Sequence, residues 1–230
     1  MKKEFVTNCG GIQQNEEITE LVFILDKSGS MAGMEKDTIG GFNAMIEKQK
    51  AVDGKVYVST LLFSNLTKVL HDRKNLKEIA PLTEKDYQVG GGTALLDAIG
   101  NAIRHIGNIH KYARKEDVPT RTLFVITTDG MENASREYHS KQIKDMIRNQ
   151  EEKYGWEFLF LAANIDAVDV ADSIGIRKER AVNYDVSEDA EEMFEEVSDA
   201  IEVFRACNAM PPKCGEMIEK NIKKRKNKAK

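Results

Sequence analysis

Between about residue 20 and residue 207, short apolar runs that resemble strands alternate with longer segments that have a helical period. The first run, Leu21 to Leu25, is apolar throughout, as expected of a strand that is buried on both faces. The segment 34–50 instead places its apolar residues mostly three and four positions apart, which is typical of an amphipathic helix. Repeated alternation of this kind predicts an α/β fold, a doubly wound and mostly parallel sheet with helices on both faces.

The remaining elements continue the same pattern. Further strands are expected at 56–63, 66–70, 122–127, 158–162 and 181–184, and further helices at 94–112, 140–153, 168–174 and 187–206. The short turn Ser64–Asn65 joins two of the strands, so we expect a hairpin whose second strand is an antiparallel edge strand. Ligands of such folds bind beyond the carboxyl ends of the strands, which directs attention to the loops there.

Composition narrows the class of protein. Hydrophobic residues make up 41% of the 230 residues and charged residues 31%, which is enough for a core and excludes a wholly disordered chain. No apolar run approaches the roughly 18 residues of a membrane span, and no signal peptide is visible. Three cysteines, Cys9, Cys207 and Cys214, are odd in number and lack metal spacing, which favours a reducing cytoplasm.

The charge distribution suggests three parts: an N-terminal extension at 1–19, the globular domain at 20–207 and a basic C-terminal tail at 208–230. From Pro211 onward the net charge is +6, whereas the rest of the chain carries -10. Pro211–Pro212 ends the preceding helix, and Met217, Ile218 and Ile222 are too few for a strongly amphipathic helix. We therefore expect a tail outside the core, either solvated or docked to nucleic acid or an acidic partner.

Three loops expected at the carboxyl ends of strands contain oxygen donors. Asp26, Ser28 and Ser30 form a D-x-S-x-S motif, Thr93 follows three glycines, and Asp129 ends a strand in the sequence Thr-Thr-Asp-Gly. This donor set has no Cys or His, which suits Mg2+, Mn2+ or Ca2+ and argues against zinc. Each motif alone has a simpler interpretation as a helix cap or a turn, but their occurrence in three converging loops favours a metal site.

These motifs resemble those of von Willebrand factor type A (VWA) domains with a complete metal-ion-dependent adhesion site, of the stand-alone bacterial type. Asp26, Ser28 and Ser30 match the family's D-x-S-x-S, Thr93 its loop threonine and Asp129 the aspartate of its T-D-G loop. The resemblance covers roughly residues 20–207. It implies a doubly wound, Rossmann-like fold and a divalent ion whose open coordination position takes a carboxylate from a partner protein. One local difference is Lys27, a cation inside the metal loop, whose side chain the alternating backbone should direct away from the ion.

The function we expect is therefore a metal-dependent protein-binding module in an intracellular assembly, which is not an enzyme and does not bind a membrane. Its partner is a protein that presents an Asp or a Glu. Two alternatives stay open: a metal-dependent hydrolase or phosphatase that uses the same ion as a Lewis acid, and a nucleic-acid-associated protein that acts through the tail. The first lacks a recognisable set of nucleophile, base and orienting group, and the second rests on charge alone.

Overall fold

The computed structural model describes residues 17–207 and 209–229, apart from the side chains of 186–189 and 226–229. Most of the predicted N-terminal extension, residues 1–16, lies outside the described residues. Its last two residues, Ile18 and Thr19, already belong to the first strand, which begins earlier than predicted.

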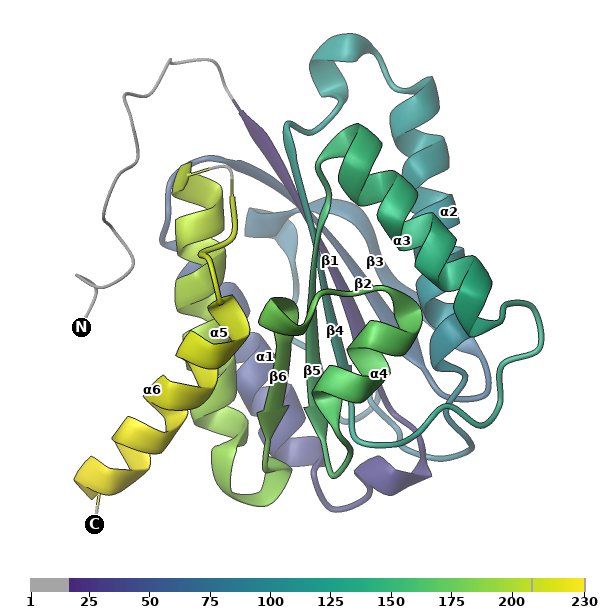
Figure 1. The fold of residues 1–230 in the computed structure, drawn as a ribbon. Helices are drawn as coiled ribbons and strands as arrows, with labels where there is room; N and C mark the ends of the chain where they lie inside the picture. Colours follow the sequence, from purple (N-terminus) through teal and green to yellow (C-terminus); the bar gives the residue numbers. More distant parts are fainter. Residues whose placement is uncertain (1–16, 208, 230) are drawn as a thin grey trace.

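Six strands form one sheet, in the order β3-β2-β1-β4-β5-β6 (Figure 1). They are β1 (Ile18–Asp26), β2 (Lys55–Phe63), β3 (Thr67–Asn75), β4 (Arg121–Thr128), β5 (Glu157–Ala163) and β6 (Ala181–Tyr184). Strand β3 pairs antiparallel with β2, and every other pairing is parallel. The predicted doubly wound, mostly parallel sheet with one antiparallel edge strand is confirmed.

Helices cover both faces of this sheet (Figure 1). They are α1 (Glu35–Lys50), α2 (Leu95–Tyr112), α3 (Ser140–Tyr154), α4 (Ala167–Ile174), α5 (Val186–Cys207) and α6 (Cys214–Ala229), with short 3-10 turns η1 (Gly29–Met31), η2 (Leu76–Glu78), η3 (Lys115–Asp117) and η4 (Lys178–Arg180). Helices α1, α5 and α6 lie on one face, and α2, α3 and α4 lie on the other.

Strand β1 shows why the sheet is buried on both sides. All nine of its residues are buried, and successive side chains point to opposite faces. Leu21 and Phe23 belong to the core beneath α1 and α5, whereas Val22 and Ile24 belong to the core beneath α2 and α3. A continuous apolar run is what two such cores require, so β1 could be recognised from the sequence.

Strand β3 extends further than predicted, to Asn75, because an edge strand does not need an apolar run. Its second half is polar, and His71 is its one buried residue, with the ring Nδ1 3.1 Å from the Thr60 hydroxyl. At Arg73 the backbone is left-handed (φ 45°), beside an irregularity in the pairing with β2. The predicted hairpin is confirmed, and the charged strand protects this edge of the sheet from pairing with other chains.

The segment after Pro211 forms a helix that packs on the core, so the prediction of a tail outside the core is wrong. Cys214, Ile218 and Ile222 of α6 are each at most 3% exposed and join the core beneath α5. These residues are four positions apart and therefore share one face of the helix. The Glu219 carboxylate also accepts a hydrogen bond from the backbone N–H of Asn183, at 2.7 Å, on the outer edge of β6.

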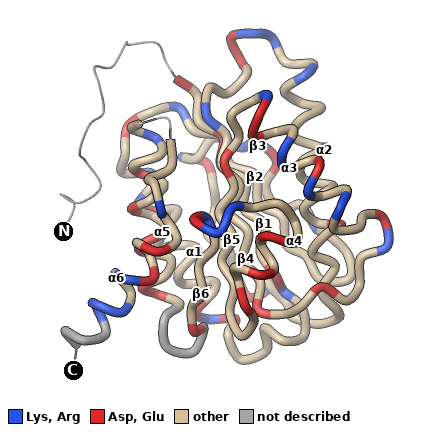
Figure 2. Tube along the Cα trace, viewed as in Figure 1, with Lys and Arg blue, Asp and Glu red and all other residues tan. Residues whose placement is uncertain are grey.

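Lys and Arg residues lie along the other side of α6 (Figure 2). Lys220, Lys223 and Lys224 are exposed, whereas Arg225 pairs with Glu195 and Glu196 of α5. The high charge of this segment is therefore the solvated face of a packed helix. Among the described residues, no helix is long and apolar enough to span a membrane.

Candidate metal centre

The candidate site lies at the carboxyl edge of the sheet, between its two central strands. Asp26 is the last residue of β1, and Asp129 directly follows β4. Because β1 and β4 are parallel neighbours, with Leu25 opposite Thr127, both carboxylates emerge at the same edge. Thr93 lies two residues before the start of α2, in the loop that crosses this edge.

Hydrogen bonds connect four of the five predicted ligand residues. The backbone N–H of Ser28 donates to Asp26 Oδ1 at 2.7 Å, and the hydroxyl oxygens of Ser28 and Ser30 lie 3.0 Å apart. The Ser30 hydroxyl donates in turn to Asp129 Oδ1 at 2.7 Å. The two strands are therefore linked, carboxylate to carboxylate, through the D-x-S-x-S loop.

Gly130 places the fifth residue, Thr93, at the same point. A Cβ atom added to Gly130 would lie 3.1 Å from Ser30 Oγ and 3.3 Å from Thr93 Oγ1, so both hydroxyls face this glycine. The backbone of Thr93 is fixed by Asn133, whose side-chain oxygen accepts from the Thr93 N–H at 2.9 Å. The structure thus brings all five predicted residues together, and their role as metal ligands stays a prediction.

The glycine loop pairs with the metal loop through its backbone. The N–H of Gly90 donates to the Lys27 carbonyl at 2.9 Å, and the N–H of Gly29 donates to the Gly91 carbonyl at 2.9 Å. Both Gly90 and Gly91 have positive φ, a conformation that other residues rarely adopt. The Lys27 ammonium donates to the Gln88 carbonyl at 3.3 Å, so this cation bonds to the backbone outside the ligand set.

Sequence reasoning missed the residues that hold Asp26 in place. The Thr128 hydroxyl donates to Asp26 Oδ2 at 2.6 Å. The phenol of Tyr87, which is 1% exposed, donates to the backbone carbonyl of Asp26. Tyr87 has no signal in a single sequence, because it is 61 positions from its partner and outside every motif.

The two carboxylates of the site are buried without a counterion. Asp26 is fully buried and Asp129 is 4% exposed, and burial raises the pKa of each carboxyl above its usual range. Hydrogen bonds from Thr128 and Ser28 oppose this rise in the pKa of Asp26, and the Ser30 hydroxyl opposes it in Asp129. No Lys or Arg of the described residues forms an ion pair with either carboxylate.

This environment fits a bound cation. Two buried carboxylates supply the negative charge, and three hydroxyls supply neutral oxygen ligands, a set that suits a hard divalent ion. No three His, Cys, Asp or Glu side chains gather at one point anywhere in the part of the chain that the structure describes. Any metal at this edge would therefore depend on the hydroxyls of Ser28, Ser30 and Thr93 for the rest of its protein ligands.

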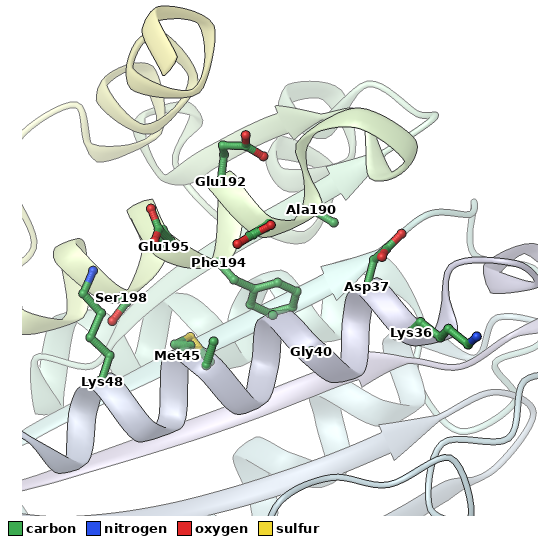
Figure 3. A pocket seen from close by; sticks show the side chains of 13 residues that line it. Lys36, Asp37, Gly40, Met45, Lys48, Ala190, Glu192, Phe194, Glu195 and Ser198 are labelled. Carbon is green, nitrogen blue, oxygen red and sulfur yellow. The ribbon is translucent and has the colours of Figure 1, made fainter. Parts of the chain in front are cut away.

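A hollow lies elsewhere, between α1 and α5 (Figure 3). This groove has a volume of about 690 Å³ and contains none of the five predicted ligand residues. Within it the Phe194 ring packs directly on Gly41, where a Cβ atom would lie 2.1 Å from the ring. Its rim carries acidic side chains of α5, Glu191, Glu192 and Glu195 among them.

Comparison with protein families decides the class of the chain. Residues 10–166, more than half of the chain, match the model of the family described as VWA domain containing CoxE-like protein. The chain belongs to this family. The resemblance to VWA domains that the three loop motifs indicated is thereby confirmed at the level of the family. No curated protein sequence matches it.

Solved structures show the same fold. Proximal thread matrix protein 1 from the mussel byssus is 12% identical, with a TM-score of 0.56, over 86% of this chain and 48% of that one. The same mussel protein with a zinc-occupied MIDAS motif has a TM-score of 0.54 at 12% identity, over 81% of this chain and 46% of that one. A von Willebrand factor type A protein from Catenulispora acidiphila is 13% identical, with a TM-score of 0.53 and coverages of 80% and 42%. This VWA chain spans less than half the length of each.

Proposed function

We propose that this VWA chain is a divalent-metal-dependent protein-binding module whose ion captures a carboxylate of a partner protein. The observation that carries the proposal is the hydrogen-bonded series from Asp26 through Ser28 and Ser30 to Asp129, with Thr93 facing the same point. These side chains form an all-oxygen cluster at the carboxyl edge of the sheet, where α/β folds bind their ligands. The mussel structure with zinc in its MIDAS motif supports metal binding at such a cluster.

Each residue has a distinct part in this proposal. The hydroxyls of Ser28, Ser30 and Thr93 would be neutral ligands, and Asp26 and Asp129 would supply the charge, directly or through water. Thr128 and Tyr87 act through Asp26, because one bonds its carboxylate and the other its backbone carbonyl. When bound, Mg2+ or Mn2+ supplies a Lewis-acidic centre, and Ca2+ also fits the donor type.

Charge explains why a partner carboxylate would be attracted. A divalent ion with two protein carboxylates around it is neutralised but not over-neutralised, so its shell can still accept an anion. Ser30 is the exposed member of the set, and the other four are at most 4% exposed. The partner group would therefore approach from the side of Ser30.

Calorimetry of metal binding tests the first half of the proposal. Wild-type protein is titrated with MgCl2, MnCl2 and ZnCl2, beside the double variant Ser28→Ala, Ser30→Ala. The matched control is Ser173→Ala, because the Ser173 hydroxyl is exposed and bonds only to the backbone of α4. We expect the double variant to lose binding and the control to keep it, and equal affinity in all three proteins would refute the site.

Capture of partner proteins in the presence of Mg2+ or a chelator tests the second half. Recovery should need both the metal and the two serines.

We propose binding rather than catalysis because the histidines are engaged elsewhere. His71, His105 and His110 contact Thr60, Asp72 and Glu20, and His139 caps α3. Metal-dependent hydrolysis of a phosphate ester that is lost in the serine double variant would instead favour the hydrolase alternative.

A further inference from the structure

Exposed apolar side chains gather at the edge of the sheet that carries the candidate metal centre. Of the six large apolar side chains that are exposed among the described residues, three follow strands at this edge. Leu66 is 81% exposed in the turn after β2, Met131 is 69% exposed two residues after Asp129, and Val168 is 36% exposed at the start of α4, after β5. Side chains of this size rarely face water without a reason when they cluster.

The sheet order places Leu66 and Val168 after strands on opposite sides of the site, whereas Met131 follows β4 itself. The strands run β2-β1-β4-β5, so Leu66 lies beyond β2, the candidate ligands lie beyond β1 and β4, and Val168 lies beyond β5. Contacts tie the first two to the site itself. Asn65, which precedes Leu66, accepts a hydrogen bond from the Gly92 N–H, and Gly130, which precedes Met131, faces the hydroxyls of Ser30 and Thr93.

Strand spacing sets the kind of segment that would fit across this edge. Neighbouring strands lie about 4.8 Å apart, so the strands that precede Leu66 and Val168 flank the site at roughly one to two strand spacings on either side. In an extended peptide, alternate side chains point to the same side and recur at about 6.6 Å. An extended segment that lies across the strand ends would therefore place one side chain in the site and its second neighbours over the flanking apolar residues.

We propose that the partner of this VWA chain presents an extended segment in which a carboxylate residue is flanked, two positions away on each side, by large apolar residues. This inference rests on the proposed function, because the carboxylate is the group that the ion captures. Leu66 contacts one flanking residue, and Met131 with Val168 contacts the other. These three side chains determine specificity and do not bind the metal.

Fluorescence polarisation with labelled peptides tests whether apolar residues beside the carboxylate strengthen binding. The apolar peptide is Ser-Leu-Gly-Glu-Gly-Leu-Ser and the polar one is Ser-Ser-Gly-Glu-Gly-Ser-Ser, each measured with Mg2+ and with chelator. Glu is used because four of the five donors are buried, so the carboxylate must reach inward. A third peptide with Gln in place of Glu removes the charge. Partial burial of each leucine should make the apolar peptide bind about tenfold more tightly than the polar one.

Variants of the chain test which of its side chains contact the leucines of the apolar peptide. Leu66→Ser and Met131→Ser should each weaken the apolar peptide about threefold, leave the polar peptide unchanged and leave Mg2+ affinity unchanged in calorimetry. Tyr112→Ser is the matched control, because Tyr112 is 78% exposed at the far end of α2. It should change none of these values.

The outcomes separate this inference from the proposed function. Equal, Mg2+-dependent binding of the apolar and polar peptides would overturn the apolar flanks and leave the metal-dependent capture standing. Binding of the apolar peptide that persists in chelator, or with Gln in place of Glu, would overturn both. Failure of both Glu peptides to bind in Mg2+ would also overturn both.

Discussion

Two carboxylates buried among hydroxyl groups oppose folding when no cation is bound. Burial raises the pKa of both Asp26 and Asp129, and the charge of Asp129 adds to this rise in Asp26. The substitution Asp129→Asn removes one charge but keeps an oxygen that can accept the Ser30 hydrogen bond. The metal-free variant should therefore melt at the same temperature as the wild type or a higher one.

The same variant should bind Mg2+ at least about 100-fold more weakly, because even an outer-shell partner of a ligand is worth 10–100-fold in affinity. Calorimetry gives the Mg2+ affinity, and thermal melts without metal give the melting temperature. Asp172→Asn, which changes an exposed carboxylate on α4, is the control for both. A large fall in the metal-free melting temperature would show that Asp129 is primarily structural.

Tyr87 holds the backbone of Asp26 from the opposite side. Tyr87→Phe removes the phenol that donates to the Asp26 carbonyl and leaves that buried acceptor without this partner. We expect the free energy of unfolding to fall by about 1–2 kcal/mol. Urea unfolding measures this, and Tyr112→Phe, at an exposed site, should have no effect. An unchanged free energy for Tyr87→Phe would mean that another group replaces the phenol.

The candidate ligands can be recognised from the sequence more easily than the residues that hold Asp26 in place. Asp26, Ser28 and Ser30 are close together in one motif, and the chemistry of their side chains is visible without a structure. Thr128 and Tyr87 bond to Asp26 across 102 and 61 positions, and such contacts depend on how the strands and loops meet. A hydroxyl that supports a ligand looks, in a single sequence, like any other buried Thr or Tyr.

Helix α6 shows how charge can conceal an amphipathic helix. Its apolar face consists of Cys214, Ile218 and Ile222 at four-residue spacing, and most of the other positions are charged or polar, five of them lysine. Strands β1 and β5 were predictable because an apolar run of five or more residues leaves few alternatives. Three apolar residues among many charges leave both a solvated tail and a packed helix open, and only packing against α5 and β6 distinguishes them.

Removing one of these side chains should destabilise the whole domain. Ile218 is fully buried, so Ile218→Ala should lower the free energy of unfolding by about 2–4 kcal/mol. Lys220→Ala, two positions later on the exposed side, is the matched control. Urea unfolding followed by circular dichroism measures both. A loss below about 0.5 kcal/mol for Ile218→Ala would mean that α6 contributes little to the stability of the fold.

At the scale of the molecule, metal binding and folding are linked. An ion that binds only the folded chain stabilises it by about 2.7 kcal/mol at a concentration 100 times its dissociation constant. For a domain of this size, that corresponds to a rise in melting temperature of roughly 5–10 °C. The rise should be absent in the Ser28→Ala, Ser30→Ala double variant and present in Ser173→Ala.

The packing of the molecule also predicts whether α6 takes part in this linkage. The helix packs against α5 and the outer edge of β6, whereas the candidate ligands lie beyond β1 and β4, and effects at separate sites usually add. Ile218→Ala should therefore melt at a lower temperature than the wild type and still gain the same stabilisation from Mg2+. Thermal melts at several Mg2+ concentrations measure both quantities on one sample. A clearly smaller or larger gain in Ile218→Ala would show that α6 and the metal-binding edge are energetically coupled, through β5 and β6 or through α5.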